Sequence, residues 1–313
     1  MTTTSKIKNW QIVTNCSSIK RRKDTTLSPS LSSRSLEELA KSWASKISKA
    51  KTLEKVIDTY GGRTFKEAIS ASKLVDAELN VISAGLGLVK ADEKIPNYNL
   101  TISTGDGSIS TWLRDRGLQS KDWWKALNQH LNKVNSLHNL LSDAPGVIFA
   151  LPSSYLKLIQ FDLDSLCLAD LERIYIITSE AGQLGLSEQL QQRCLPYDER
   201  LDGAINFQGT RNDFAQRALK HFVEEIDFKK ITLPESKSKV LSFLSKHKKP
   251  VLPTRVKASD KEIQKLIKIN WKTYDGKRDP LHRFLRDVAL VSCEQKRFST
   301  LWNEVKDQKS KVN

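Results

Sequence analysis

The chain has 313 residues, with 51 Lys and Arg against 36 Asp and Glu, so its formal net charge is +15. Because 39% of the residues are hydrophobic, the composition excludes a disordered polycation, and no apolar run approaches the ~20 residues that span a bilayer. The first residues lack the apolar stretch of a signal peptide, so we expect a cytoplasmic protein without a membrane partner. Four cysteines without C-x-x-C spacing argue against structural zinc and a disulfide framework, and we expect no metal and no cofactor.

The positive charge is concentrated near the end of the chain. Residues 1–228 hold 29 basic and 27 acidic residues, whereas residues 229–313 hold 22 basic and 9 acidic residues. We therefore expect two domains, 1–228 and 229–313, of which the second binds the backbone of double-stranded DNA. The alternative, that these lysines only keep the protein soluble, stays open. Nothing in the sequence indicates an obligate protein partner.

The first part alternates β-rich runs with helical patterns, which is typical of an α/β fold with a parallel sheet and flanking helices. Residues 35–47, 64–69, 117–141 and 211–225 read as helices, the first two with capping pairs at Ser35 and Glu38 and at Thr64 and Glu67. We expect four parallel strands at residues 10–14, 79–82, 146–151 and 173–178.

The second part is helical throughout in its pattern. Ser259 with Glu262 forms a capping box, and Asp279 followed by Pro280 is typical of a helix start. These signals predict a compact bundle of helix-turn-helix type. We expect its DNA contacts to come from Lys246, Lys248, Lys249, Arg255, Lys257, Lys277, Arg278 and Arg283.

Each expected strand ends in small or polar residues. Asn15 and Cys16 follow the first strand, Ser83 ends the second, Ser153 follows the third and Glu180 follows the fourth. In open parallel sheets, ligands bind at the carboxyl ends of the strands. The sequence has no Walker loop and no G-x-G-x-x-G, and Gly85 and Gly87 alone are equally compatible with a structural turn.

Four short patterns within residues 10–225 carry a family resemblance. They are Cys16-Ser17-x-x-Lys20, Tyr60-Gly61-x-x-x-Phe65, Ser83-Ala84-x-x-Gly87-Leu88-Val89 and Pro96-x-Tyr98-x-Leu100. Together they resemble the uracil-DNA-glycosylase-like superfamily, specifically the bacterial domains allied to YaaA proteins and to the glycosylase-like domain of archaeosine tRNA-modifying enzymes. In size and basic tail the chain is most similar to bacterial anti-phage glycosylases that excise glucosylated hydroxymethylcytosine. One departure is Asn99, where relatives often have Asp.

The resemblance implies a DNA glycosylase that hydrolyses the N-glycosidic bond of a modified base in phage DNA and leaves an abasic site. Such an enzyme flips the base out of the duplex and stabilises an oxocarbenium-like transition state. We expect Asn15 to orient water and Asp92 or Glu180 to oppose the sugar cation. The expected substrate-binding residues are Cys16, Lys20, Tyr60, Ser83, Gly85, Gly87, Tyr98, Ser153, Asp202 and Arg211.

Alternatives remain open at each level. Asp92 is equally readable as a solvated loop acid beside Lys90 and Lys94, and Cys16 as a small packed thiol rather than a nucleophile. Asp202 and Arg211 can cap the last helix of the first domain. For the whole protein, the rival functions are a base-exchange or modification enzyme acting on tRNA or other RNA, and a non-catalytic DNA-binding protein.

Overall fold

The structure is a computed structural model of the chain, and it describes residues 9–21, 26–52, 54–142, 144–251 and 253–310. Two compact units divide between Lys249 and Pro250. The step in charge at residue 229 lies before this boundary. The segment between the two includes α13 (Leu233–Ser245), which packs Val240 and Leu244 against the core of the first unit. Part of the basic segment therefore belongs to the first unit.

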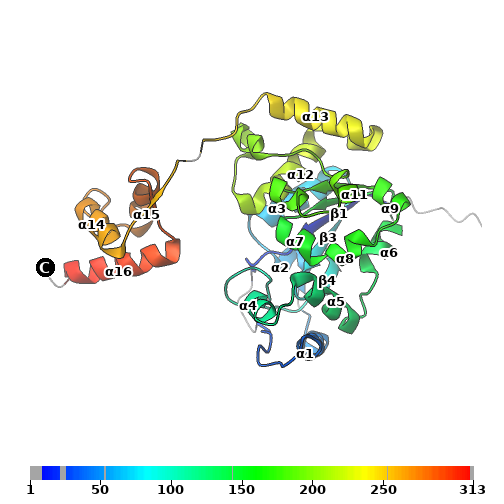
Figure 1. Ribbon diagram of the computed structural model, residues 1–313, viewed down its shortest axis with the longest axis horizontal. Helices are drawn as coiled ribbons and strands as arrows, with labels where there is room; N and C mark the ends of the chain where they lie inside the picture. The colour runs from blue at the N-terminus through cyan, green and yellow to red at the C-terminus, as the bar shows by residue number, and fades with distance from the viewer. Residues whose placement is uncertain (1–8, 22–25, 53, 143, 252, 311–313) are drawn as a thin grey trace, which may run out of the picture. The chain divides into compact units, whose positions relative to one another are not determined.

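The first unit is an α/β structure around a five-stranded sheet of order β4-β3-β1-β6-β7 (Figure 1). The four predicted strands are present and parallel: β1 (Gln11–Asn15), β3 (Glu78–Ser83), β6 (Val147–Ala150) and β7 (Ile174–Ile177). A fifth strand, β4 (Gly87–Lys90), runs antiparallel to β3 at the edge. The prediction of four strands was therefore incomplete, because Gly87, with φ of +72°, allows the chain to reverse directly after β3.

Helices cover both faces of the sheet, as the alternation of its side chains requires. Val13 and Phe149 point to the face covered by α1 (Leu36–Lys49), α5 (Ser120–His130) and α7 (Ser153–Leu158). Ile12 and Ile148 point to the opposite face, covered by α3 (Arg63–Leu74), α12 (Phe214–Glu225) and α13. The other elements are short: β2 (Glu54–Lys55), α2 (Val56–Thr59), β5 (Lys94–Ile95), α4 (Ser110–Arg114), α6 (Ser136–Ser142), α8 (Gln160–Asp164), α9 (Leu168–Glu172), α10 (Glu180–Gln183) and α11 (Glu188–Gln191).

The predicted helix starts were partly right. Ser35 caps α1, and its hydroxyl accepts a hydrogen bond from the Glu38 amide at 3.1 Å. Thr64 is not a cap, because α3 begins at Arg63 directly after Gly62, whose φ is +87°. The single helix expected over residues 117–141 is divided into α5 and α6, since Asn132 and Asn135 adopt positive φ between them.

The second unit contains α14 (Asp260–Asn270), α15 (Arg278–Asp287) and α16 (Gln295–Ser310) around a small apolar core. The capping box of Ser259 and Glu262 is confirmed. Asp279 lies inside the first turn of α15 rather than at its cap. The unit is not helical throughout, since β8 (Val256–Lys257) and β9 (Val291–Ser292) form a parallel pair. Within the described residues of both units, no helix has the length and hydropathy needed to cross a bilayer.

A buried histidine lies where α12 meets α13. His221 is 1% exposed, its Nδ1 lies 2.6 Å from the hydroxyl of Tyr197, and its ring packs at a tilt against that of Phe243. Burial, assisted by the charge of His247, lowers the pKa of His221 to about 4. The folded unit thus holds this imidazole in its neutral form.

The stability of the first unit should therefore fall in mild acid. Between pH ~6.5 and pH ~4 the unfolded chain binds a proton at this histidine that the folded chain excludes, which lowers the free energy of unfolding by about 3 kcal/mol at pH ~4. Urea titrations across this pH range should show that His221→Phe loses this part of the pH dependence. Equal pH dependence in both proteins would contradict the assignment.

Candidate active site at the carboxyl edge of the sheet

Polar side chains from distant parts of the chain meet at the carboxyl ends of β1, β3 and β6. We call this group the polar cluster; its members are Cys16, Lys20, Tyr60, Ser83, Tyr98 and Tyr155. Cys16 follows β1, Ser83 ends β3, and Tyr155 lies in the first turns of α7 after β6. Since β3 and β6 flank β1 on opposite sides, the cluster lies where the strand order reverses, the usual ligand site of such sheets.

Three hydroxyl groups form a short hydrogen-bonded chain. The hydroxyl of Tyr98 lies 2.5 Å from that of Tyr60 and 2.6 Å from that of Ser83. Ser83 Oγ also accepts hydrogen bonds from the amides of Gly85, at 3.2 Å, and Leu86, at 3.0 Å. With its acceptor sites taken, Ser83 donates to Tyr98, and Tyr98 donates to Tyr60. This direction leaves the proton of Tyr60 for a further acceptor.

The tyrosines of the polar cluster are held in their protonated form. Tyr60 and Tyr98 are at most 1% exposed and Tyr155 is 6% exposed. Burial, reinforced by the neighbouring Cys16, raises the pKa of each of the three well above its usual value. They can therefore donate hydrogen bonds to a ligand but cannot act as bases near neutral pH.

Lys20 supplies positive charge to the polar cluster. Its Nζ lies 4.3 Å from the centre of the Tyr98 ring and 5.9 Å from that of Tyr60, a cation–π arrangement. Burial lowers the pKa of Lys20, and the neighbouring Cys16 partly opposes that shift. The Cys16 thiol lies 3.0 Å from the hydroxyl of Tyr155. The cluster therefore combines a cation, phenolic donors and a thiol.

The turn after β3 is shaped to receive Tyr98. A Cβ on Gly85 would lie 2.8 Å from Cε2 of Tyr98, so only glycine permits this contact. The indoles of Trp43 and Trp123 donate to the carbonyls of Gly85 and Ala84, each at 2.7 Å, and hold the turn in place. Gly87 begins β4 with positive φ beside Asn128. Both glycines thus position the site through the backbone.

Asn15 lies beside the polar cluster with its side chain fixed. Its Nδ2 donates to the carbonyl of Cys16 at 2.9 Å, and its Oδ1 accepts from Gln216 of α12 at 2.9 Å. Gln216 is fully buried and is also within 3.0 Å of Thr14 Oγ1 and the Ala150 carbonyl. Asn15 Oδ1 retains a second lone pair, so it can accept a hydrogen bond from water.

The two predicted acids are not brought into the polar cluster. Asp92 is exposed at the opposite edge of the sheet, since β4 returns the chain there and the Ala91 amide pairs with the Leu79 carbonyl. This exposed position favours the alternative interpretation, in which Asp92 is a solvated acid in a loop. Glu180 begins α10 after β7, at the same edge as the cluster but exposed to solvent. Ser153, at the start of α7, is partly buried two residues before Tyr155.

Asp202 and Arg211 belong to a separate part of the unit. Asp202 receives a hydrogen bond from Arg217 at 2.6 Å, and Arg217 also binds Asp213 at 2.8 Å and two backbone carbonyls. This buried ion-pair network holds the loop before α12. Arg211 is exposed at the start of that loop's last 3₁₀ turn. Neither residue contacts the polar cluster.

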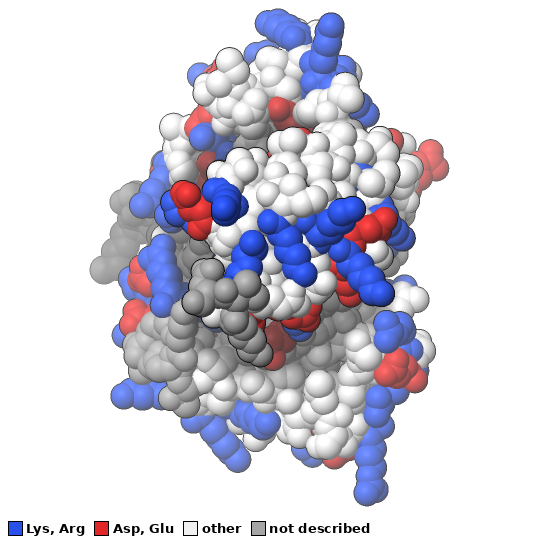
Figure 2. Space-filling view, turned by 90° about the vertical axis from the view of Figure 1, so that its left-hand side faces the viewer, with Lys and Arg blue, Asp and Glu red and all other residues white. Residues whose placement is uncertain are grey.

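The eight predicted DNA-contacting residues are divided between the units. Lys246, Lys248 and Lys249 follow α13 in the first unit and are exposed, and the other five lie in the second unit. Arg255, Lys277 and Arg278 pair with the neighbouring carboxylates of Asp287, Asp275 and Asp279. Figure 2 shows Lys and Arg side chains spread over one face of the molecule, with fewer acidic side chains among them.

Two side chains of the site were missed in the sequence. Tyr155 was detectable only as the polar residue two positions after Ser153, at the end of a predicted strand. Gln216 lies on the buried face of α12, and nothing local marks it as the partner of Asn15. Within the described ranges, no three His, Cys, Asp or Glu side chains are grouped to hold a metal ion.

Comparison with known proteins gives no further assignment. No protein-family model matches the chain, and neither a curated protein nor a solved structure matches it significantly. The superfamily resemblance therefore rests on the four sequence patterns alone.

Proposed function

We propose that the protein is a glycosylase that hydrolyses the N-glycosidic bond of a modified base in double-stranded DNA and leaves an abasic site. The observation that carries the proposal is the polar cluster, which unites Cys16, Lys20, Tyr60, Ser83 and Tyr98 at the ligand edge of the sheet. These residues come from all four of the patterns on which the resemblance rests. The excess of basic residues supports a polyanionic substrate.

The proposed reaction breaks the bond between the sugar C1′ and the base nitrogen, whose electron pair leaves with the base. A water oxygen bonds to C1′, and its proton ends on the departing base. The developing negative charge on the base needs donors, and the Lys20 ammonium and the free proton of Tyr60 supply them. Asn15 Oδ1 orients the water. Among the described residues of the cluster there is no carboxylate, so assistance falls on the leaving base rather than on the sugar.

The base must enter past Lys20. Tyr60, Ser83 and Tyr98 are at most 1% exposed, whereas Lys20 is only partly buried. In the proposal, a flipped base displaces the Lys20 side chain from the Tyr98 ring and takes its place against that ring. The ammonium then contacts the edge of the base, which couples binding to the placement of the catalytic charge.

Base exchange is the second candidate, and Cys16 favours it. In that reaction the thiolate attacks C1′ while the bond to the base breaks, which forms a sulfur–sugar bond. A second base then displaces the sulfur, so that the thiolate is regenerated and the sugar carries the new base. Cys16 lies where this nucleophile is needed, at the ligand edge of the sheet directly after β1, and it is 8% exposed. Its hydrogen bond to Tyr155 fits an equally simple structural role.

Abasic-site formation separates the candidate functions. We expect the protein to release base from DNA carrying glucosylated hydroxymethylcytosine, with strand breaks after mild alkali, and to leave unmodified and uracil-containing DNA intact. Incorporation of a labelled free base into RNA or DNA, without abasic sites, would instead identify base exchange. Binding without release of base from any of these substrates would leave a non-catalytic protein and refute the glycosylase.

A further inference from the structure

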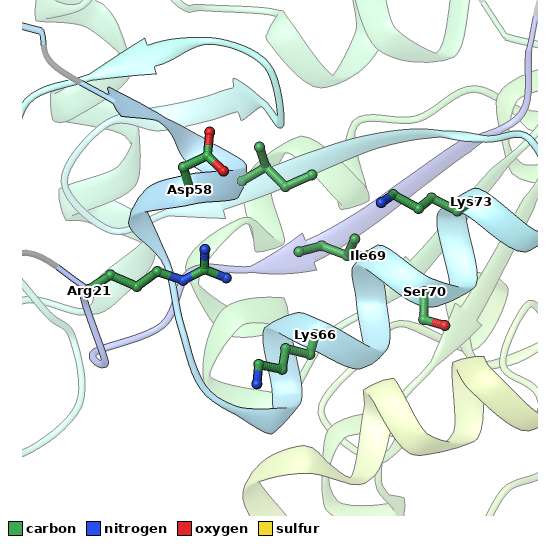
Figure 3. A pocket seen from close by; sticks show the side chains of 7 residues that line it. Arg21, Asp58, Lys66, Ile69, Ser70 and Lys73 are labelled. Carbon is green, nitrogen blue, oxygen red and sulfur yellow. The ribbon is translucent and has the colours of Figure 1, made fainter.

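A basic groove lies along α3 in the first unit, outside the polar cluster. It has a volume of about 440 Å³ and is open to solvent, and its lining residues are Arg21, Ile57, Asp58, Lys66, Ile69, Ser70 and Lys73. Arg21 lies in the segment that follows β1, and Asp58 lies in α2. The four residues from Lys66 to Lys73 in this lining belong to α3 (Figure 3). Arg21 and Lys73 reach toward the hollow from opposite ends (Figure 3).

One face of α3 forms a wall of the groove. Lys66, Ile69, Ser70 and Lys73 follow the spacing i, i+3, i+4 and i+7, which places them on one side of a helix. Lys66 and Lys73 lie about 10 Å apart along the axis, at 1.5 Å per residue. The wall therefore presents two cations in line, with Ile69 between them.

The cations of the groove are not neutralised by neighbours. Among the described residues, Arg21, Lys66 and Lys73 make no ion pair, whereas Arg63 and Lys220 nearby both pair with Glu67. Asp58 is the single acid in the lining. A hollow with three unpaired cations and one acid attracts anions, and a series of cations in line suits a polyanion.

Backbone hydrogen bonds connect the groove with the polar cluster. The Arg21 amide donates to the Thr59 carbonyl at 3.0 Å, and the Gly61 amide donates to the Ile19 carbonyl at 2.8 Å. These two bonds flank the antiparallel bridge between Lys20 and Tyr60, two members of the cluster. Arg21 of the groove is therefore the chain neighbour of Lys20 of the cluster.

We propose that this groove binds consecutive phosphates of the nucleic-acid strand whose base enters the polar cluster. Arg21, Lys66 and Lys73 contact the phosphates, and Ile57 and Ile69 contact the sugars between them. The identity of the strand rests on the proposed function, but the groove itself requires only a nucleic-acid backbone. This assigns a backbone contact to the α/β unit, where the sequence had placed such contacts only in residues after 228.

Charge changes of both signs test the groove. The full-length protein is titrated with a short unmodified DNA duplex at salt concentrations between about 0.05 and 0.2 M. For K66E/K73E we expect binding at least about tenfold weaker, with a log–log salt slope smaller by about 2. D58N should bind more tightly than the wild type. The control K41E/K49E makes the same charge change on α1, which covers the other face of the sheet, and should bind like the wild type.

The outcomes separate this inference from the proposed function. Wild-type affinity and slope in K66E/K73E would overturn the groove, whatever the enzyme does to modified DNA. Equal losses in K66E/K73E and K41E/K49E would overturn it as well, since they would show only an effect of net charge. Conversely, a groove-specific loss of binding in a protein that forms no abasic sites would sustain the groove while rejecting the glycosylase.

Discussion

Replacing Arg217 with methionine should destabilise the first unit by about 3–5 kcal/mol, because it removes the closest cationic partner of a buried carboxylate. Arg217 is 1% exposed, and its guanidinium binds Asp213, Asp202 and the carbonyls of Phe207 and Thr210. Asp213 is 5% exposed, and Arg217, at 2.8 Å, is a much closer cation than Arg63, at 3.9 Å. Methionine fills a similar volume, so the loss reports the uncompensated charge rather than a cavity.

The measurement is denaturant unfolding of the full chain, followed by tryptophan fluorescence. Arg211→Met is the matched control, since Arg211 is exposed and its replacement should change the free energy of unfolding by less than about 0.5 kcal/mol. Asp202→Asn should lie between the two, because the Asp202 side chain is 27% exposed. A loss below about 1 kcal/mol in Arg217→Met would show that the network does not hold the loop before α12.

Removing the Lys20 charge should lower the rate of base release at least about 100-fold, the usual effect of losing one donor to a developing anion. Tyr98→Phe breaks the chain from Ser83 to Tyr60 and should slow release about tenfold or more. Both effects should be on the rate of the bound complex under single-turnover conditions, with DNA affinity little changed. Lys41→Met, on the surface of α1, is the matched control for Lys20→Met and should keep the wild-type rate.

The pH dependence of base release is a second test of the role of Lys20. Burial lowers the pKa of Lys20, so activity that needs its ammonium should decline on the alkaline side at a pH below the ordinary lysine value of about 10.4. Lys20→Arg keeps the charge at all accessible pH and should move this decline upward. If the alkaline decline in activity of Lys20→Arg equals that of the wild type, another group is responsible for it. A wild-type rate in Lys20→Met would show that Lys20 takes no part in the reaction.

The strands were readable from the sequence because each is a short apolar run that stops at polar or small residues. Because parallel strands end at the same edge of a sheet, the ends of the first two predicted strands also placed Cys16 and Ser83 at one edge. Asp92 lies away from that edge for a single physical reason. The reversal at Gly87 makes β4 antiparallel, and an antiparallel strand carries the chain to the other edge before Asp92 is reached.

Side-chain contacts between distant segments could not be predicted from the sequence. Asp202 and Arg211 were predicted to bind substrate or to cap the last helix of the first domain. The partner of Asp202 is instead Arg217, which lies on the buried face of α12. An arginine inside a helix is ordinarily solvated, so no local pattern marks it as buried. Tyr155 was missed likewise, because its contact with Cys16 joins residues 139 positions apart. The charge step was informative about composition but not about packing, since α13 is both basic and part of the first unit.

The central claim is that the polar cluster performs the chemistry. The most direct test is mass spectrometry of the free base released from glucosylated phage DNA by the wild type and by Lys20→Met, with both proteins shown to bind the same DNA equally. We predict release of the intact modified base by the wild type, with the abasic sugar carrying oxygen from labelled water, and a rate at least about 100-fold lower for the variant. Equal release by both proteins, or none from the wild type, would contradict the claim.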